Sequence, residues 1–382
     1  MENKLIFEFS KNKTDGDSSL NNLLGGKGAN LAEMSNMGIP VPPGFTITTE
    51  ACNYFTENKK FPDNLETEIK KAVHNLESFS DKSFGSAGTP LLLSVRSGGR
   101  ISMPGMMDSI LNIGLNDANV SQLAEAFNDE RFALDSYRRL IQMYANVVLG
   151  VEHERFEAVL ANKKRMDDVD SDADFNVDQL NWIINAYKNT VERFTDAAFP
   201  QEPYEQLTGA IEAVFNSWQN KRAVTYRKIN NIPDVWGTGA TVQTMVFGNL
   251  NNQSGTGVAF TRNPSNGDKE LYGEYLINAQ GEDVVAGIRT PHPIKKHSKV
   301  QQESLESKFP KSYKEILEIS TKLENHFKEV QDIEFTIENE DIYLLQTRQA
   351  KRTAQASVKI AIDMQKEGIV TKEEAIAMVD AN

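Results

Sequence analysis

Gln331-Asp-Ile-Glu-Phe-Thr-Ile337 and Ile342-Tyr-Leu-Leu-Gln-Thr-Arg348 are two adjacent segments with the pattern of a β-hairpin. In the first segment apolar residues alternate with polar ones, and a period of two is typical of a strand. The second segment is mostly apolar and follows almost at once. The sequence therefore predicts a hairpin with a three-residue loop at 339–341.

The polar residues of this hairpin are expected on one face. Pairing about residue 340 places Glu334 opposite Gln346 and Asp332 opposite Arg348. The other face is expected to pack on the core and to consist of Ile333, Phe335, Ile337, Tyr343 and Leu345.

This set of side chains has the chemistry of a metal and phosphate site. Hard cations such as Mg²⁺ prefer carboxylate and amide oxygens and often share them with nucleotide phosphates. Arginine binds phosphate oxygens through a two-pronged guanidinium. We interpret the hairpin as the metal-phosphate wall of a nucleotide site. The alternative is a solvated sheet face with cross-strand ion pairs.

Size and charge limit the possible functions. A chain of 382 residues is too long for one compact core and suggests two or three folding units. The net charge of −13 argues against a general binder of nucleic acid or membrane surfaces. One cysteine, Cys52, permits no disulfide within the chain. No signal peptide or apolar span is visible, so we expect a cytoplasmic protein.

A second phosphate-binding element is predicted near the start of the chain. The turn Gly25-Gly-Lys-Gly28 opens a helical pattern, and it offers backbone amides and the cation of Lys27 to an anion. It is not a Walker A loop, because Gly28 stands where Ser or Thr would hold Mg²⁺. The alternative is a glycine-rich helix start with a surface lysine.

A third element lies near residue 100. The apolar run Pro90-Leu-Leu-Leu-Ser-Val-Arg96 predicts a buried strand that brings Arg96 to an edge. The following stretch, 97–108, has three glycines and two arginines counted with Arg96, and such a loop can fold over phosphates. An ordinary turn-rich connection is the alternative.

The remaining chain divides by its periodicity. Apolar residues recur at helical spacing over 117–230 and predict a helical insertion. From about 236 short strands with short links predict an antiparallel sheet. The tail from 349 is helical, and Thr371 to Glu374 forms a capping-box pattern.

Together these motifs resemble the nucleotide-binding part of the pyruvate, phosphate dikinase family over essentially the whole chain. The similar stretches are Leu24-Gly-Gly-Lys-Gly28, Leu31-Ala-Glu-Met34, Val41-Pro-Pro-Gly-Phe45, Ser94-Val-Arg-Ser97, Ser102-Met-Pro-Gly-Met-Met-Asp108, Ser136-Tyr-Arg-Arg139, Gln243-Thr-Met-Val-Phe-Gly248, Ser254-Gly-Thr-Gly-Val-Ala-Phe-Thr-Arg-Asn-Pro264, Gly273-Glu-Tyr-Leu-Ile-Asn-Ala-Gln-Gly-Glu-Asp283 and Leu345-Gln-Thr-Arg348.

The resemblance implies an α+β fold of the ATP-grasp type, with antiparallel sheets and a helical insertion. The implied ATP-binding domain comprises 1–115 and 206–350, with a second lobe at about 241–350. The implied insertion is 116–205. Residues 351–382 would form a helical linker toward a phosphohistidine domain that is absent from this chain.

The resemblance also implies a function. The family converts ATP, pyruvate and phosphate to AMP, phosphoenolpyruvate and pyrophosphate, and this part would bind Mg·ATP. It would pass the pyrophosphoryl group to a histidine on the carrier domain, which makes the chain part of a phosphotransferase with paired acceptors. Alone it would support nucleotide binding and the first partial step. Expected partners are ATP and AMP, the carrier domain, a pyruvate-binding barrel and, in the full-length enzyme, a second copy.

The resemblance assigns roles to particular residues. Glu334 and Gln346 would carry Mg²⁺, while Lys27, Arg96 and Arg348 would hold phosphates and act in catalysis. The further nucleotide contacts implied are Gly105, Arg139, Gln243, Met245, Val246, Thr256, Gly257, Glu274, Glu282 and Asp332.

One family feature is missing from the sequence. The carrier histidine of the family lies in a Thr-Ser-His-Ala setting, and none of the five histidines here, at 74, 153, 292, 297 and 326, has those neighbours. We therefore expect no phosphohistidine on this chain. The alternatives are the nucleotide-binding part of phosphoenolpyruvate synthase and a stand-alone adenine-nucleotide-binding module.

Overall fold

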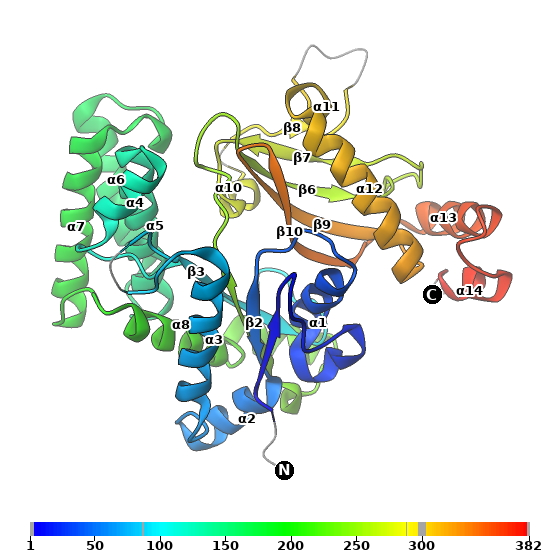
Figure 1. Ribbon diagram of the computed structural model, residues 1–382, viewed down its shortest axis with the longest axis horizontal. Coiled ribbons are helices and arrows are strands. Elements are labelled where there is room, and N and C mark those ends of the chain that lie inside the picture. Colours follow the sequence, from blue (N-terminus) through cyan, green and yellow to red (C-terminus); the bar gives the residue numbers. More distant parts are fainter. Residues whose placement is uncertain (1–3, 86–87, 288, 297–302, 380–382) are drawn as a thin grey trace. The chain divides into compact units, whose positions relative to one another are not determined.

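The computed structural model describes residues 4–85, 88–287, 289–296 and 303–379, so His297 lies outside the described residues. The chain forms two compact units, which are described separately (Figure 1). The first consists of Met1–Glu33 and Pro43–Met245, and the second of Met34–Pro42 and Val246–Asn382.

The first unit is built on a five-stranded antiparallel sheet in the order β1-β2-β5-β3-β4. Its strands are β1 (Ile6–Phe9), β2 (Gly44–Ile47), β3 (Leu93–Gly99), β4 (Ser109–Ile113) and β5 (Thr238–Thr244). The first of the strands expected after about residue 236 is therefore the central strand of this first sheet. Because β5 pairs with β2 and β3, chain segments about 200 residues and 150 residues away flank it.

The two faces of the first sheet differ in character. One face carries the buried side chains of Phe45, Val95 and Val242, and α2 (Thr49–Asn58) and α8 (Pro203–Ser217) pack against the sheet. The residues between them face the other way and are polar or glycine. There the helix α1 (Asn21–Asn36) covers the sheet through its glycines, as the contacts below show.

The remaining helices of this unit are mostly consecutive, as the periodicity predicts. They are α3 (Leu65–Ser80), α4 (Val120–Phe127), α5 (Glu130–Val147), α6 (His153–Asp167), α7 (Val177–Thr195) and α9 (Lys221–Ile229), with short 3-10 turns at Ser18–Leu20, Asp172–Asp174 and Asp234–Trp236. Helices α4 to α7 group together (Figure 1), and α5 packs against β4. The apolar side chains of Tyr137, Ile141 and Tyr144, which recur at helical spacing, are buried on α5.

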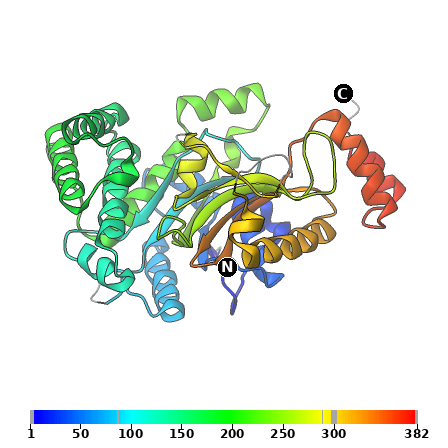
Figure 2. The ribbon, with the colours of Figure 1, turned by 90° about the horizontal axis from the view of Figure 1, so that it is seen from above.

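The second unit contains another five-stranded antiparallel sheet, in the order β10-β9-β6-β7-β8. Its strands are β6 (Gly255–Phe260), β7 (Tyr272–Ile277), β8 (His292–Pro293), β9 (Gln331–Glu338) and β10 (Asp341–Gln349), and its helices are α10 (Gly281–Ala286), α11 (Leu305–Lys308), α12 (Pro310–Phe327), α13 (Ala354–Lys366) and α14 (Lys372–Ala377). Helix α12 lies along β9 and β10 (Figures 1 and 2).

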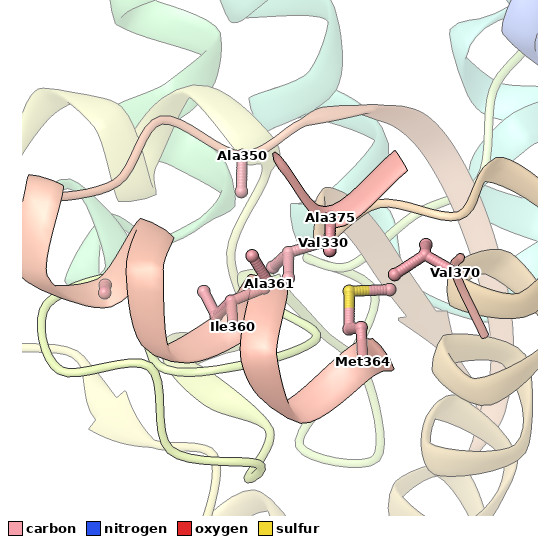
Figure 3. Packing of buried hydrophobic residues seen from close by; sticks show 8 residues of the cluster. Val330, Ala350, Ile360, Ala361, Met364, Val370 and Ala375 are labelled. Carbon is pink, nitrogen blue, oxygen red and sulfur yellow. The ribbon is translucent and has the colours of Figure 1, made fainter. Parts of the chain in front are cut away.

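The C-terminal helices form a hydrophobic cluster with residues next to the second sheet. Figure 3 shows Ile360 and Met364 of α13, Val370 and Ala375 gathered around Val330, which precedes β9. The expected capping box is present at the start of α14, where Thr371 accepts from the amide of Glu374 and the Glu374 carboxylate accepts from the amide of Thr371. This tail therefore packs against Val330 and Ala350, which flank β9 and β10.

The hairpin of β9 and β10 corrects two expectations. The loop has two residues, Asn339 and Glu340, both with positive φ (49° and 69°), because Glu338 pairs with Asp341. This backbone suits the right-handed twist of a tight hairpin. Tyr343 and Leu345 do not share the buried face of Ile333, Phe335 and Ile337. The shorter loop shifts the early pairing by one residue, so Ile342 and Leu344 take those positions.

A mixture of helices and antiparallel sheets is thus confirmed. None of the described helices combines the length and the apolar character that crossing a bilayer requires.

Candidate functional site

A bulge at Leu345 sets the geometry of the hairpin wall. Up to Leu344 the pairing follows the two-residue loop, and after the bulge Gln346 lies opposite Glu334 and Arg348 opposite Asp332. The extra residue reverses which β10 side chains face the core. The expected pairs are therefore confirmed, and all four side chains share the face opposite the buried isoleucines.

The wall extends across the sheet in two rows. Glu334 lies opposite Val258 of β6, which lies opposite Glu274 of β7, so one row reads Gln346, Glu334, Val258 and Glu274. The neighbouring row reads Arg348, Asp332, Phe260 and Tyr272. Glu274 thus shares the face of Glu334, but one strand separates the two.

Asp332 and Arg348 form a close ion pair. The Arg348 Nε donates to Asp332 Oδ2 over 2.7 Å, and the two side chains are 35% and 10% exposed, respectively. The pKa of the Asp332 carboxyl is raised, first because burial disfavours its charge and further because Glu334 is negative, while Arg348 opposes both effects. Burial is therefore the main reason for the raised pKa, and the negative charge of Glu334 adds to it.

The donor set of the wall fits a hard divalent cation. Glu334 and Gln346 lie directly opposite each other and offer a carboxylate and an amide oxygen, and Asp332 adds a second carboxylate in the next row. A cation here would favour the charged form of the Asp332 carboxyl, which burial and the neighbouring Glu334 disfavour. Within the described ranges no three His, Cys, Asp or Glu side chains form a closed metal cluster. Phosphate oxygens and water would have to complete the coordination, as is usual for Mg²⁺.

A pocket of about 440 Å³ lies beside the wall on the second sheet. Val258, Phe260 and Glu274 from the wall's rows are part of its lining. The ion pair of Lys295 with Glu270, 3.0 Å between Nζ and Oε2, also borders it. The pocket is thus partly apolar with charged groups at its rim, as ligand pockets often are.

In the first unit the structure brings Lys27 and Arg96 to the same sheet face. A Cβ on Gly98 would lie 3.2 Å from the Cβ of Lys27, so Lys27 stands over β3 at that position. Arg96 precedes Gly98 by two residues on the same strand and therefore points to the same side. Both predicted phosphate-binding cations are partly exposed.

This approach depends on the glycines of the predicted cradle. Gly25 has φ 68° and ψ 164°, which interrupts the helix, and a Cβ there would lie 1.8 Å from the carbonyl oxygen of Gly98. A Cβ on Gly28 would lie 2.6 Å from the Thr46 side chain. Only glycine at 25 and 28 allows the backbone to lie this close to the strands.

A polar row that the sequence analysis did not identify completes this face. Thr46 of β2, Thr241 of β5 and Arg96 of β3 lie side by side, and the two threonine hydroxyl oxygens are 3.5 Å apart. Gln243 lies in the next row with Ser94, whose hydroxyl donates to the Gln243 carbonyl over 3.3 Å. The alternation within Gly44-Phe-Thr-Ile47 was the available signal, but the partner strands were unknown.

The loop between β3 and β4 carries Gly105 at an exposed turn. Its φ is 70°, and a Cβ there would meet nothing within 4 Å. Met103 of this loop is buried, whereas Ile101, Ser102 and Pro104 are exposed.

The other candidates lie at separate places. On α5, Arg139 donates to the buried carboxylate of Asp135 over 3.0 Å. Met245 follows β5 and donates its amide to the Leu92 carbonyl over 2.9 Å, while Val246 begins the second unit. Glu282 lies in the first turn of α10 and is half-buried.

Thr256 and Gly257 are packed within the second sheet. Thr256 lies on the same sheet face as Val258 and Glu334, in the next row. Its hydroxyl donates to the Phe335 carbonyl over 3.1 Å. Gly257 faces the core, where a Cβ would lie 2.6 Å from the Phe335 ring.

Comparisons with known proteins show which family the chain resembles. The family model described as "Pyruvate phosphate dikinase, AMP/ATP-binding domain" matches residues 21–81, 56–313 and 295–369. The pyruvate, phosphate dikinases of Rhizobium meliloti (strain 1021) and Clostridium symbiosum are each 50% identical to this chain, and the chloroplastic one of Mesembryanthemum crystallinum is 48% identical. Each alignment covers 99% of this chain.

The chain spans only part of these relatives. It covers 42% of the bacterial proteins from Rhizobium and Clostridium and 39% of the plant protein. All three carry the dikinase name, so the comparisons do not favour the phosphoenolpyruvate synthase alternative.

Proposed function

Because the chain belongs to the AMP/ATP-binding domain family of pyruvate phosphate dikinase, we propose that it binds Mg·ATP and supplies the nucleotide half of a dikinase reaction. The imidazole of a carrier histidine on another domain would attack the β-phosphorus. The bond from that phosphorus to the bridging oxygen would break, and AMP would leave with the electron pair. The pyrophosphoryl group would then reside on the histidine.

The chain's own residues would position and neutralise the phosphates. The guanidinium groups of Arg96 and Arg348 and the ammonium of Lys27 would contact phosphate oxygens. Phosphoryl transfer depends mainly on positioning and charge neutralisation, and these contacts would provide both. Glu334 and Gln346 would hold Mg²⁺, which when bound neutralises phosphate charge. The same proposal keeps the other candidates as nucleotide contacts: Gly105, Arg139, Gln243, Met245, Val246, Thr256, Gly257, Glu274, Glu282 and Asp332.

The finer architecture is part of the proposal. We propose the ATP-grasp type of fold, with 1–115 and 206–350 as the ATP-binding domain, 116–205 as the helical insertion and 351–382 as the connection to the carrier domain. The partners proposed are that carrier domain, a pyruvate-binding barrel and a second copy of the full-length enzyme. The proposed compartment is the cytoplasm.

The cross-strand register of the hairpin is the observation that carries this proposal. This register brings two carboxylates, an amide and a guanidinium together on one sheet face. A sheet face that is only solvated does not require this combination of groups. Titration calorimetry with Mg·ATP tests it. Arg96→Ala and Glu334→Gln should each weaken binding at least tenfold, a change of about 1.4 kcal/mol.

A matched ion pair provides the control. Arg155 and Glu152 form an exposed pair of 2.7 Å at the start of α6. Arg155→Ala and Glu152→Gln should leave the affinity for Mg·ATP unchanged. Normal binding by both site variants, with folded protein, would place the nucleotide site elsewhere.

A further inference from the structure

The loop from Arg100 to Asp108 is attached at three points to one neighbouring segment. This segment, residues 218–236, runs from the end of α8 through α9 to the 3-10 turn. The loop and the segment lie in the same compact unit. Each attachment uses a different kind of interaction.

The two ends of the loop are held by their charged residues. The Arg100 guanidinium lies over the Trp236 ring, 5.2 Å from its centroid, and the Arg100 carbonyl accepts from Asn21 Nδ2 over 3.3 Å. At the other end Asp108 Oδ2 accepts from Asn220 Nδ2 over 2.9 Å, and Asp108 Oδ1 accepts from the Arg222 guanidinium.

The middle of the loop is held by a buried methionine. Met103 is 6% exposed and packs with Trp218, Ala223 and Ile232, all from the same segment. The amide of Met106 donates to the Met103 carbonyl over 3.2 Å and closes a turn. The turn leaves Gly105 exposed at the tip, with open space where a Cβ would be. The base of the loop is therefore held in place, while its tip at Gly105 is unobstructed.

Asp108 has a particular place in this arrangement. It immediately precedes Ser109, and Ser109 lies opposite Arg96 in the register of β3 and β4. Its side chain is 18% exposed, whereas that of its partner Arg222 is 53% exposed. The carboxylate thus sits at the root of the loop, and both of its oxygens are used by donors from one segment.

We infer that Asp108 is a positioning residue for nucleotide binding: through Asn220 and Arg222 it holds the loop tip at a fixed place relative to Arg96. This inference rests on the proposed function. A loop that is already ordered loses less conformational entropy when a ligand binds, so its fixation raises affinity. Release of Asp108 should therefore weaken binding without removing any group that touches phosphate.

The test uses the whole chain and two measurements. Hydrogen exchange of the backbone amides at 101–107, without nucleotide, reports whether the loop is anchored. Titration calorimetry with Mg·ATP reports whether anchoring contributes to binding. Asp108→Asn should accelerate exchange in the loop and weaken affinity about three- to tenfold, because it removes a charge-assisted hydrogen bond. Glu152→Gln, which removes the charge of an exposed pair on α6, should do neither.

A charge exchange separates positioning from simple damage. The double variant Asp108→Arg with Arg222→Asp restores an ion pair in reversed orientation, and the amide of Asn220 can turn its oxygen toward the new guanidinium. Each single change should weaken binding, and the double variant should return to within about threefold of the wild type, that is, within roughly 0.7 kcal/mol.

The outcomes are distinct. Unchanged exchange and affinity in Asp108→Asn would overturn the inference, and so would faster exchange with unchanged affinity. Failure of the double variant to recover, while its melting temperature equals that of the wild type, would also overturn it. If the wild type itself binds no Mg·ATP, the proposed function fails first, and the exchange data still report the anchoring of the loop.

Discussion

Gly25 is the described glycine of the first unit at which an added side chain would meet the closest neighbouring atom. Its combination of φ 68° and ψ 164° is essentially restricted to glycine, and its Cβ position lies 1.8 Å from a carbonyl oxygen. Gly25→Ala should lower the free energy of unfolding by about 3–5 kcal/mol, as expected for strain combined with overpacking. Chemical unfolding monitored by circular dichroism measures this loss.

Gly38 offers the matched control for this substitution. Its φ is 70°, but a Cβ there would meet nothing within 4 Å. Gly38→Ala should therefore cost only the conformational penalty of about 1–2 kcal/mol. Equal losses for both variants would show that the close approach of Gly25 to Gly98 contributes no strain.

Asp332 predicts a pH dependence of stability. Its folded pKa is raised above the ordinary value of 3.8, so the folded state binds this proton more tightly than the unfolded state. The resulting stabilisation is complete below pH 3.8 and is lost as the pH rises through the folded pKa. Asp332→Asn cannot titrate. The free energy of unfolding of wild type minus that of the variant should therefore fall as pH rises above 3.8.

Urea titrations of both proteins at a series of pH values measure this difference. A difference that is flat or rises with pH would contradict the raised pKa.

Single residues were predictable where chemistry and period agreed. Asp332, Glu334, Gln346 and Arg348 share a face as expected, because strand alternation fixes faces once the pairing is known. Tyr343 and Leu345 were wrongly placed. The loop is one residue shorter than expected, which shifts the early pairs by one residue, and the bulge at Leu345 shifts the later pairs back to the expected register. Nothing in local sequence distinguishes the extra residue in a run of Tyr-Leu-Leu.

At the scale of elements, the bulge in the β9–β10 hairpin accommodates one extra residue and leaves the pairs of the wall in register. Leu345 is the extra residue, and without it Gln346 would still follow Leu344 into the position opposite Glu334. Deletion of Leu345 should therefore keep the wall intact. Deletion of Thr347 should instead move Arg348 to the buried position opposite Ile333.

Calorimetry with Mg·ATP on the two deletion variants tests this description. The Leu345 deletion should change affinity less than about threefold, and the Thr347 deletion should reduce it more than about tenfold, a difference of roughly 1.4 kcal/mol against 0.7 kcal/mol. Equal losses with intact secondary structure would refute the assigned register.

Arg262 joins the sheet of the second unit to two helices. Its guanidinium is fully buried and donates to Glu324 on α12 over 2.9 Å and to Glu367, after α13, over 2.8 Å. Arg262→Met would leave the buried Glu324 carboxylate without this partner and should destabilise the protein by about 3–5 kcal/mol.

Denaturant unfolding measures this loss, with Glu367→Gln as a milder variant because Glu367 is 25% exposed. A loss for Arg262→Met that does not exceed the loss for Glu367→Gln would contradict a buried clamp. These ion pairs could not be predicted from the sequence, since Glu324 and Glu367 are 62 and 105 residues away from Arg262.

At the scale of the whole molecule, composition and motifs predicted the family, while long-range pairing was out of reach. The helices of 120–195 follow directly from apolar spacing, because helical contacts are local. The central position of β5 in the first sheet was not predictable, because it depends on partners near residues 45 and 95. Functional motifs could be identified without knowledge of the strand pairing, because they depend only on the residue types.

The proposed function predicts that nucleotide binding and pyrophosphoryl transfer can be measured separately. It covers 42% of the dikinases from Rhizobium meliloti (strain 1021) and Clostridium symbiosum, and its sequence has no histidine in the expected carrier setting. We expect the isolated chain to bind nucleotide and to transfer a pyrophosphoryl group only when a carrier domain is added. Mass spectrometry of an added carrier domain after incubation with Mg·ATP would detect the transfer, and Arg96→Ala should abolish it.

Titration of the wild-type chain with Mg·ATP in a calorimeter measures whether the chain has a nucleotide site. We predict one saturable site per chain at micromolar to millimolar nucleotide, about −4 to −8 kcal/mol, that weakens when Mg²⁺ is chelated or when Glu334 is changed to Gln. No heat of binding from folded wild-type protein at millimolar nucleotide would contradict it.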